Sequence, residues 1–238
     1  MIKAIAFDLD DTLISKRQYD HACLRSVAAH LAERFSINFE EVSVDLWKEY
    51  DELNRSHTID AVLEKRGLFS KELLKELVEV YRKTPAGDCV YPDTVNSLEK
   101  ARSMGLAIFL VTDGKIEAQS EKIKNTGIEP YFTRIIFTYA FGEGRKKPDK
   151  TAFEQILGET GINANEMIYV GDNPYRDFLE TKRLGIHTIR IKREDGQFRF
   201  TELPQNYEAD QEICELDGVF EEINRINGLS KARGRREA

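Results

Sequence analysis

Three stretches of this 238-residue chain place acidic or hydroxyl side chains directly after a short apolar segment. These stretches are Asp8-Leu9-Asp10-Asp11-Thr12, Thr112-Asp113-Gly114 and Gly171-Asp172-Asn173, the last followed by Asp177 one helical turn later. Any one of them could end a strand or cap a helix. All three together, with Lys147 just before Pro148, indicate a site that capping alone does not explain.

The carboxylates of Asp8, Asp10, Asp172 and Asp177 would repel one another if they share one crevice. Two like charges about 4 Å apart repel by roughly 4 kcal/mol at an effective dielectric constant near 20. Lys147 alone does not offset several such pairs. A divalent cation does, and hard oxygen ligands that leave room for water and phosphate favour Mg²⁺ over Ca²⁺. The sequence therefore predicts a magnesium site.

Parallel strands can bring these residues together, because ligands of open α/β sheets lie beyond the carboxyl ends of the strands. Short apolar runs predict five strands, at Ile2–Phe7, Leu106–Val111, Arg134–Phe137, Met167–Val170 and Thr188–Ile191. Helical patterns separate them. Asp93 and Asp149 are placed to cap two helices, and Pro174 to occupy the first turn of a third. This alternation predicts an α/β domain whose parallel sheet is covered on both faces.

A helical segment interrupts the alternation after the first strand. Residues 16–83 contain four amphipathic helical patterns and no convincing strand, and the hinges are expected at Ile14–Gln18 and Thr84–Pro92. We therefore predict a core domain of residues 1–15 and 90–228 and an inserted helical-bundle domain of residues 16–89. Residues 229–238 are expected to form a disordered tail.

Composition excludes several classes of protein. The chain has 35 Lys and Arg against 42 Asp and Glu, a net charge of −7, which disfavours a general binder of nucleic acid or anionic membranes. No apolar stretch approaches the roughly 20 residues of a membrane span, and the acidic N-terminus does not resemble a signal peptide. Cys23, Cys89 and Cys214 are odd in number and widely spaced, which fits reduced thiols in the cytoplasm.

The motifs Asp8-Leu9-Asp10-Asp11-Thr12, Thr112, Lys147-Pro148 and Gly171-Asp172…Asp177 resemble, in order and spacing, the four motifs of the haloacid dehalogenase superfamily. The resemblance covers nearly the whole chain, including a helical cap after the first motif. It implies a Rossmann-like, doubly wound core, a requirement for Mg²⁺ and, in most members, phosphoryl transfer through an aspartyl-phosphate.

The resemblance also implies a role for each matched residue. Asp8 would be the nucleophile, Asp10 the acid and base, Thr112 a hydrogen-bond donor to the phosphoryl group and Lys147 its counter-charge. Asp8, the backbone carbonyl of Asp10, and Asp172 would hold Mg²⁺, while Asp177 would orient Lys147 or the metal's waters. The backbone amide near Asp113 would help to bind the phosphate. Acid work by Asp10 at neutral pH requires surroundings that raise its pKa.

At two places the sequence leaves the family's usual motif or offers a choice of residue. Asp11 stands where the family often has Gly, and we expect a turn residue there. Lys147 is preferred to Lys146 because it directly precedes the proline.

The dehalogenases of the family lack an acid at the position of Asp10, so we predict a Mg²⁺-dependent phosphatase of a small phosphorylated metabolite. A sugar phosphomutase, a phospho-acceptor switch and a catalytically silent binding scaffold stay open, as does the oligomeric state.

Overall fold

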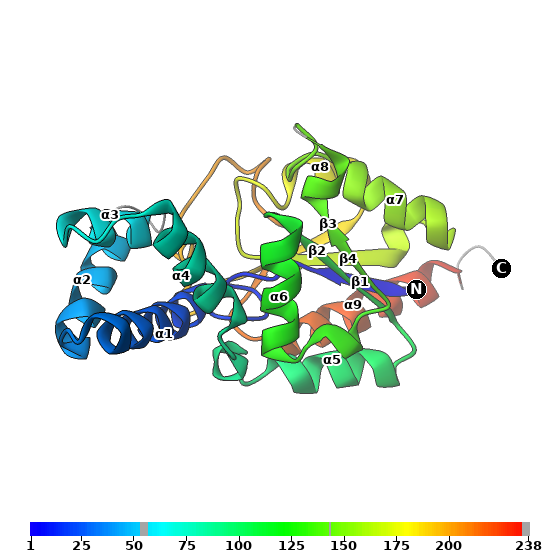
Figure 1. The fold of residues 1–238 in the computed structure, drawn as a ribbon. Helices are drawn as coiled ribbons and strands as arrows, with labels where there is room; N and C mark the ends of the chain where they lie inside the picture. The colour runs from blue at the N-terminus through cyan, green and yellow to red at the C-terminus, as the bar shows by residue number, and fades with distance from the viewer. Residues whose placement is uncertain (53–56, 143, 235–238) are drawn as a thin grey trace. The chain divides into compact units, whose positions relative to one another are not determined.

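The computed structural model describes residues 1–52, 57–142 and 144–234 (Figure 1). The chain divides into two compact units, one of Met1–Lys16 with Val90–Ala238 and one of Arg17–Cys89. The boundaries expected from the sequence lie beside these divisions, and whether either unit is an independent domain stays a prediction. Within the described residues, no helix is both long enough and apolar enough to span a membrane.

In the described residues of the first unit, six parallel strands form one sheet in the order β3-β2-β1-β4-β5-β6. The strands are β1 (Ala4–Phe7), β2 (Ala107–Thr112), β3 (Arg134–Phe137), β4 (Met167–Gly171), β5 (His187–Ile191) and β6 (Gln211–Ile213). The strand order reverses between β1 and β4, which is the switch point where doubly wound sheets bind ligands. The predicted Rossmann-like α/β fold is confirmed.

Helices cover both faces of the sheet (Figure 1). They are α5 (Thr94–Ser103), α6 (Ile116–Thr126), α7 (Thr151–Thr160), α8 (Leu179–Arg183) and α9 (Asp217–Gly234). Short 3₁₀ turns lie at Glu129–Tyr131, Thr138–Phe141 and Ala164–Glu166, and one in the second unit at Gly87–Cys89. Alternate residues of β1 point to opposite faces: Ile5 and Phe7 join the cluster that includes α5, α6 and α9, while Ala4 and Ala6 join the cluster that includes α7. All four are buried, as expected of a central parallel strand.

The second unit contains the predicted helical bundle. Its helices in the described residues are α1 (Lys16–Phe35, which begins in the first unit), α2 (Phe39–Glu52), α3 (Thr58–Lys65) and α4 (Lys71–Lys83). Their apolar faces share one buried core that includes Leu31, Leu46 and Leu77. The Ser70 hydroxyl accepts a hydrogen bond from the Leu73 amide at 3.1 Å and so caps α4.

Several local predictions were wrong. Asp93 does not cap α5, because its carboxylate accepts hydrogen bonds from Arg193 at 2.8 Å and from the Leu216 amide at 2.8 Å. Pro174 lies in a turn ahead of α8, not in its first turn. The exposed three-residue strand β6 was not predicted, since it has no apolar run. Helix α9 continues to Gly234 where we expected a disordered tail from residue 229, and residues 235–238 lie outside the described residues.

Candidate active site

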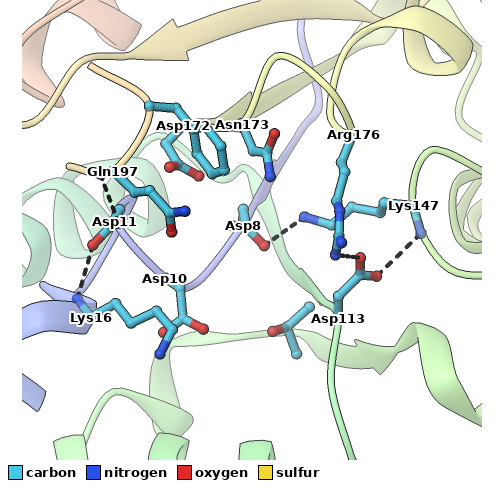
Figure 2. Close-up of a pocket in the computed structure, with 12 residues that line it drawn as sticks. Asp8, Asp10, Asp11, Lys16, Asp113, Lys147, Asp172, Asn173, Arg176 and Gln197 are labelled. Carbon is cyan, nitrogen blue, oxygen red and sulfur yellow. Dashed lines mark hydrogen bonds and ion pairs between the residues drawn. The ribbon is translucent and has the colours of Figure 1, made fainter. Parts of the chain in front are cut away.

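The carboxyl ends of β1, β2 and β4 open into one pocket of about 260 Å³ in the first unit (Figure 2). The described residues that line it are Asp8, Asp10, Asp11, Lys16, Thr112, Asp113, Lys147, Asp172, Asn173, Arg176, Gln197 and Phe198. The structure thus brings every predicted site residue together: all but Asp177 line the pocket, and Asp177 lies behind them, hydrogen-bonded to Lys147. Lys146 is absent from the lining, in agreement with the preference for Lys147.

Lys147 is the centre of a buried polar network. Its ammonium group lies 2.6 Å from Asp8 Oδ1, 2.8 Å from Asp177 Oδ1 and 3.0 Å from the Tyr169 hydroxyl. Tyr169 in turn donates to Asp177 Oδ1 at 2.9 Å. Burial lowers the pKa of Lys147, but the carboxylates of Asp177 and Asp8 outweigh it and hold the pKa well above its usual value. Lys147 is therefore a fixed cation against Asp8.

Asp113 fixes the loop that carries Lys147. Its Oδ1 accepts hydrogen bonds from the Lys147 amide at 3.2 Å and from the Thr138 hydroxyl at 2.5 Å, and its Oδ2 pairs with Arg176 at 3.3 Å (Figure 2). The carboxylate of Asp113 is thus engaged with protein groups. Its predicted contact with phosphate would have to come from the backbone, as expected from the sequence.

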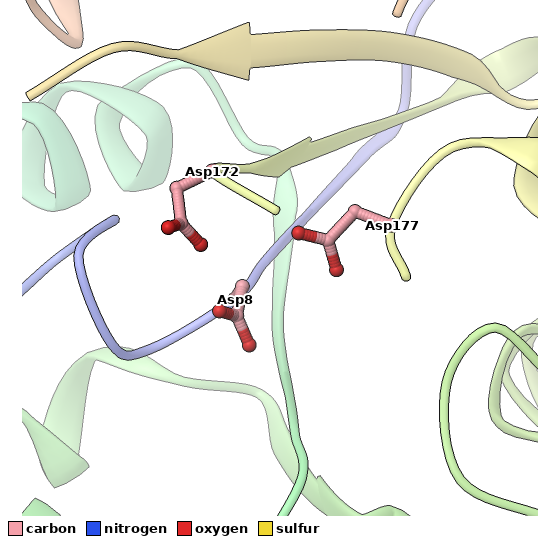
Figure 3. A group of neighbouring side chains, drawn as sticks. All are labelled: Asp8, Asp172 and Asp177. Atoms are coloured by element: carbon pink, nitrogen blue, oxygen red, sulfur yellow. The ribbon is translucent and has the colours of Figure 1, made fainter. Parts of the chain in front are cut away.

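Asp8, Asp172 and Asp177 form a buried carboxylate triad (Figure 3). One carboxylate oxygen from each lies within 4.8 Å of the others. Asp177 is already satisfied, because its Oδ2 also accepts a hydrogen bond from the Asn173 amide at 2.9 Å. Among the residues that the structure describes, none donates a hydrogen bond to the carboxylate of Asp172, which is 6% exposed. An unpartnered buried carboxylate beside a second one is a donor set suited to a hard cation.

The charges in the pocket also favour a bound cation. Burial and the neighbouring Asp177, only partly offset by Lys147, raise the pKa of Asp8 to about 7. Burial and the charge of Asp8 raise the pKa of Asp172 well above its usual value. The described residues of the lining supply five carboxylates, against Lys16, Lys147 and Arg176 as cations. A bound divalent cation would remove this excess of negative charge.

The stability of the metal-free protein is expected to fall as the pH rises from about 4 to about 7. In that range unfolded Asp8 loses its proton near pH 3.8 while folded Asp8 keeps it until about pH 7, so folding takes up a proton. This shift corresponds to about 4 kcal/mol. Thermal melting in chelator should therefore give a lower Tm at pH 8 than at pH 5, and Mg²⁺ should raise Tm more at pH 8. A metal-free Tm that rises across this range would contradict the expected pKa of Asp8.

Asp10 has a partner that sequence reasoning missed. The Lys122 ammonium on α6 donates to both oxygens of Asp10, at 2.8 and 3.1 Å. Burial raises the pKa of Asp10, but Lys122 and Lys16 outweigh it, so the pKa lies below its ordinary value. The expectation that the surroundings raise this pKa is therefore wrong for the protein alone. Gln119, one turn earlier on α6, donates to the Thr112 hydroxyl at 2.8 Å.

Asp11 adopts a left-handed backbone conformation, with φ of 53°. Its buried carboxylate accepts hydrogen bonds from the Lys16 amide at 3.0 Å and the Gln197 amide at 3.1 Å. Aspartate tolerates this conformation better than most residues because its short side chain bonds to nearby backbone. The expected turn role of Asp11 agrees with this geometry. Gln197 and Phe198, which also line the pocket, were not predicted.

Comparison with known proteins identifies the family. The model of the haloacid dehalogenase-like hydrolases matches residues 2–185. The glyceraldehyde 3-phosphate phosphatase of Methanocaldococcus jannaschii is 32% identical over 196 residues, covering 80% of this chain and 85% of that one. The glyceraldehyde 3-phosphate phosphatase of Pyrococcus abyssi is 30% identical over 237 residues, covering 97% and 98%. A haloacid dehalogenase-type phosphatase from Thermococcus onnurineus superposes with a TM-score of 0.59 at 27% identity, covering 95% and 98%.

The chain belongs to the haloacid dehalogenase-like hydrolases. The resemblance drawn from its four motifs is confirmed, and these three similar proteins are phosphatases.

Proposed function

We propose that this protein is a Mg²⁺-dependent phosphatase that hydrolyses a small phosphorylated metabolite through a phosphoryl group carried on Asp8. The observation that carries the proposal is the carboxylate of Asp8, which lines the pocket with Lys147 at 2.6 Å and is grouped with Asp172. The names of the relatives support a short-chain substrate such as glyceraldehyde 3-phosphate. The pocket volume of about 260 Å³ suits a phosphate with a small leaving group.

The reaction would proceed in two displacements at phosphorus. In the first, an oxygen of Asp8 forms a bond to phosphorus, the bond between phosphorus and the leaving oxygen breaks, and Asp10 gives that oxygen a proton. In the second, a water oxygen attacks phosphorus, its proton returns to Asp10, and the bond to Asp8 breaks. The phosphate dianion adds negative charge next to Asp10, which raises the pKa of this acid when substrate binds.

The remaining groups would stabilise the transferring phosphoryl group. Lys147 supplies positive charge next to the reacting oxygen of Asp8, and Asp177 and Tyr169 hold its ammonium in place. The Thr112 hydroxyl accepts a hydrogen bond from Gln119, which leaves its own proton to donate to a phosphoryl oxygen.

Mg²⁺ fits the donor set of this site. Asp8, the backbone carbonyl of Asp10, and Asp172 would hold it, and Asp172 has a buried carboxylate that lacks a donor among the described residues. When bound, the ion would neutralise charge between the phosphate and the carboxylate that attacks it.

The proposal is tested by measuring phosphate release from a panel of small phosphate esters that includes glyceraldehyde 3-phosphate, in Mg²⁺ and in excess chelator. A phosphatase releases phosphate steadily and only with the metal. A phosphomutase consumes ester without net phosphate release. A phospho-acceptor switch takes up one phosphoryl group per protein, releases one equivalent of the alcohol and holds the phosphoryl group, so no steady phosphate release follows. Either result, or full activity in chelator, would overturn the proposal.

Replacing Asp10 by Asn should separate substrates by their leaving groups. Alkyl phosphates need a proton on the departing oxygen, so Asp10→Asn should lose roughly 10²–10⁴-fold in kcat/KM on them. Aryl phosphates have better leaving groups and should lose much less in kcat/KM, which reports the first displacement. Asp88→Asn, a neutralised exposed aspartate, is the matched control. Equal losses on both substrate types, with an unchanged Mg²⁺ dependence, would argue against Asp10 as the acid.

A further inference from the structure

Helix α6 presents one buried polar face to the pocket residues. Its buried positions are Gln119, Lys122, Ile123 and Thr126, which recur at the spacing of a single helical face. Ile123 packs in the hydrophobic cluster that also contains Ile5 and Phe7 of β1, and this contact fixes the rotation of α6 about its axis. The two polar side chains ahead of it are thereby directed at the residues that follow β1 and β2.

The contacts of these two side chains are with Asp10 and with the Thr112 loop. Lys122 contacts both carboxylate oxygens of Asp10, and its side chain is 10% exposed against 25% for Asp10. Gln119 donates to the Thr112 hydroxyl and to the Asp113 carbonyl at 2.7 Å. The approach is close, since a Cβ placed on Gly114 would lie 2.9 Å from Cγ of Gln119. Helix α6 is therefore in close contact with the loop that follows β2.

Lys122 contacts the pocket residue Asp10 but does not itself line the pocket. Asp10 lines the pocket, whereas Lys122 is not among the described residues of the lining. A lysine that bound the phosphate directly would have to line it, as Lys147 does. Burying an ammonium is costly unless it is paired, so the two hydrogen bonds to Asp10 stabilise Lys122 in this buried position.

We propose that Lys122 is a positioning residue that holds the carboxylate of Asp10 in the orientation required to exchange a proton with the leaving oxygen. The inference rests on the proposed function of the site. A contact to both oxygens fixes the rotation of the carboxylate about its bond to Cβ, which a single hydrogen bond does not. Asp10 needs this fixed direction twice in each cycle, to give a proton and to take one back.

The test is a double-mutant cycle with Lys122→Met and Asp10→Asn, read on one alkyl and one aryl phosphate. Lys124→Met is the matched control, because Lys124 lies on the same helix and is 53% exposed. We expect Lys122→Met to lower kcat on the alkyl phosphate by about 10²-fold, the cost of a misplaced catalytic group. KM should change by less than about threefold, because binding is not lost. The burst of leaving group from the aryl phosphate, which reports the first displacement alone, should slow far less than that from the alkyl phosphate, and Lys124→Met should behave like the wild type.

In the Asp10→Asn background, Lys122→Met should have almost no further effect on kcat, since the group it positions has gone. The inference is overturned if Lys122→Met slows the first displacement of both substrates equally, if it raises only KM, or if it lowers kcat as much with Asp10→Asn as without it. If melting shows that Lys122→Met does not fold, Lys122→Gln, which keeps a donor and loses the charge, takes its place in the cycle. An inactive wild type would instead refute the proposed function, before any variant is compared.

Discussion

Asp8→Asn is expected to lower kcat by at least about 10⁴-fold on every phosphate ester, the scale of losing a nucleophile. An amide is a poor nucleophile, so no bond to phosphorus forms at this position. The substitution also removes the negative partner that lies 2.6 Å from Lys147. The effect should not depend on the leaving group, because the first bond-forming step is lost for all substrates. The measurement is the rate of phosphate release on an alkyl and an aryl phosphate.

Asp20→Asn is a useful control for this variant. Asp20 is also a buried aspartate, it accepts a hydrogen bond from Tyr50 at 2.6 Å, and it does not line the pocket. A comparable loss in Asp20→Asn would show that neutralising a buried aspartate damages the fold. Retention of more than about one tenth of the wild-type rate by Asp8→Asn would exclude Asp8 as the nucleophile.

Asp172→Asn should produce two effects of opposite sign. Activity should fall by more than about 100-fold, because a ligand of the metal is lost. The Tm of the metal-free protein at pH 8 should rise, since a neutral amide replaces a buried carboxylate next to Asp8 to which no described residue donates a hydrogen bond. The rise in Tm that Mg²⁺ gives the wild type should disappear. A residue with a purely structural role would lower activity and stability together.

The metal-free Tm of Asp172→Asn and its response to Mg²⁺ together test whether Asp172 is a ligand of the metal. If Asp172→Asn keeps the Mg²⁺-dependent rise in Tm, the ion is held elsewhere. If its metal-free form melts below the wild type, the carboxylate of Asp172 is stabilised by groups other than a metal. Asp88→Asn, at an exposed position, should change neither the activity nor the response to Mg²⁺.

The sequence predicted the sheet and the residues at its strand ends because both depend on local patterns. Apolar runs mark buried strands, and a carboxylate at the end of such a run has to lie at the edge of the sheet. Asp8, Thr112 and Asp172 could be predicted for this reason. The register of the parallel strands then places them at one edge, with Phe7 opposite Leu110 and Val170.

Three residues of the site, Tyr169, Lys122 and Gln119, were not predicted, because nothing in the sequence around them distinguishes them from ordinary core or surface residues. Tyr169 lies inside an apolar strand and is typical of a core residue, and its hydroxyl bond to Asp177 depends on the fold. Lys122 is one of three lysines within ten residues, at 115, 122 and 124, and only the rotation of α6 buries it. Asp93 was predicted wrongly for the same reason. Its local sequence is typical of a helix cap, but its carboxylate pairs instead with Arg193, which lies 100 residues away in the chain.

Trapping the phosphoryl group on Asp8 tests the central claim most directly. The protein is mixed with a phosphate ester in Mg²⁺, quenched in acid during turnover, digested, and searched for a phosphorylated peptide. We predict the phosphoryl group on the peptide that contains Asp8 and none in Asp8→Asn. With an aryl phosphate, whose leaving group does not need the acid, Asp10→Asn should carry more of it, because its second step lacks its base. Steady phosphate release with no label on Asp8 in any of these proteins would contradict the account.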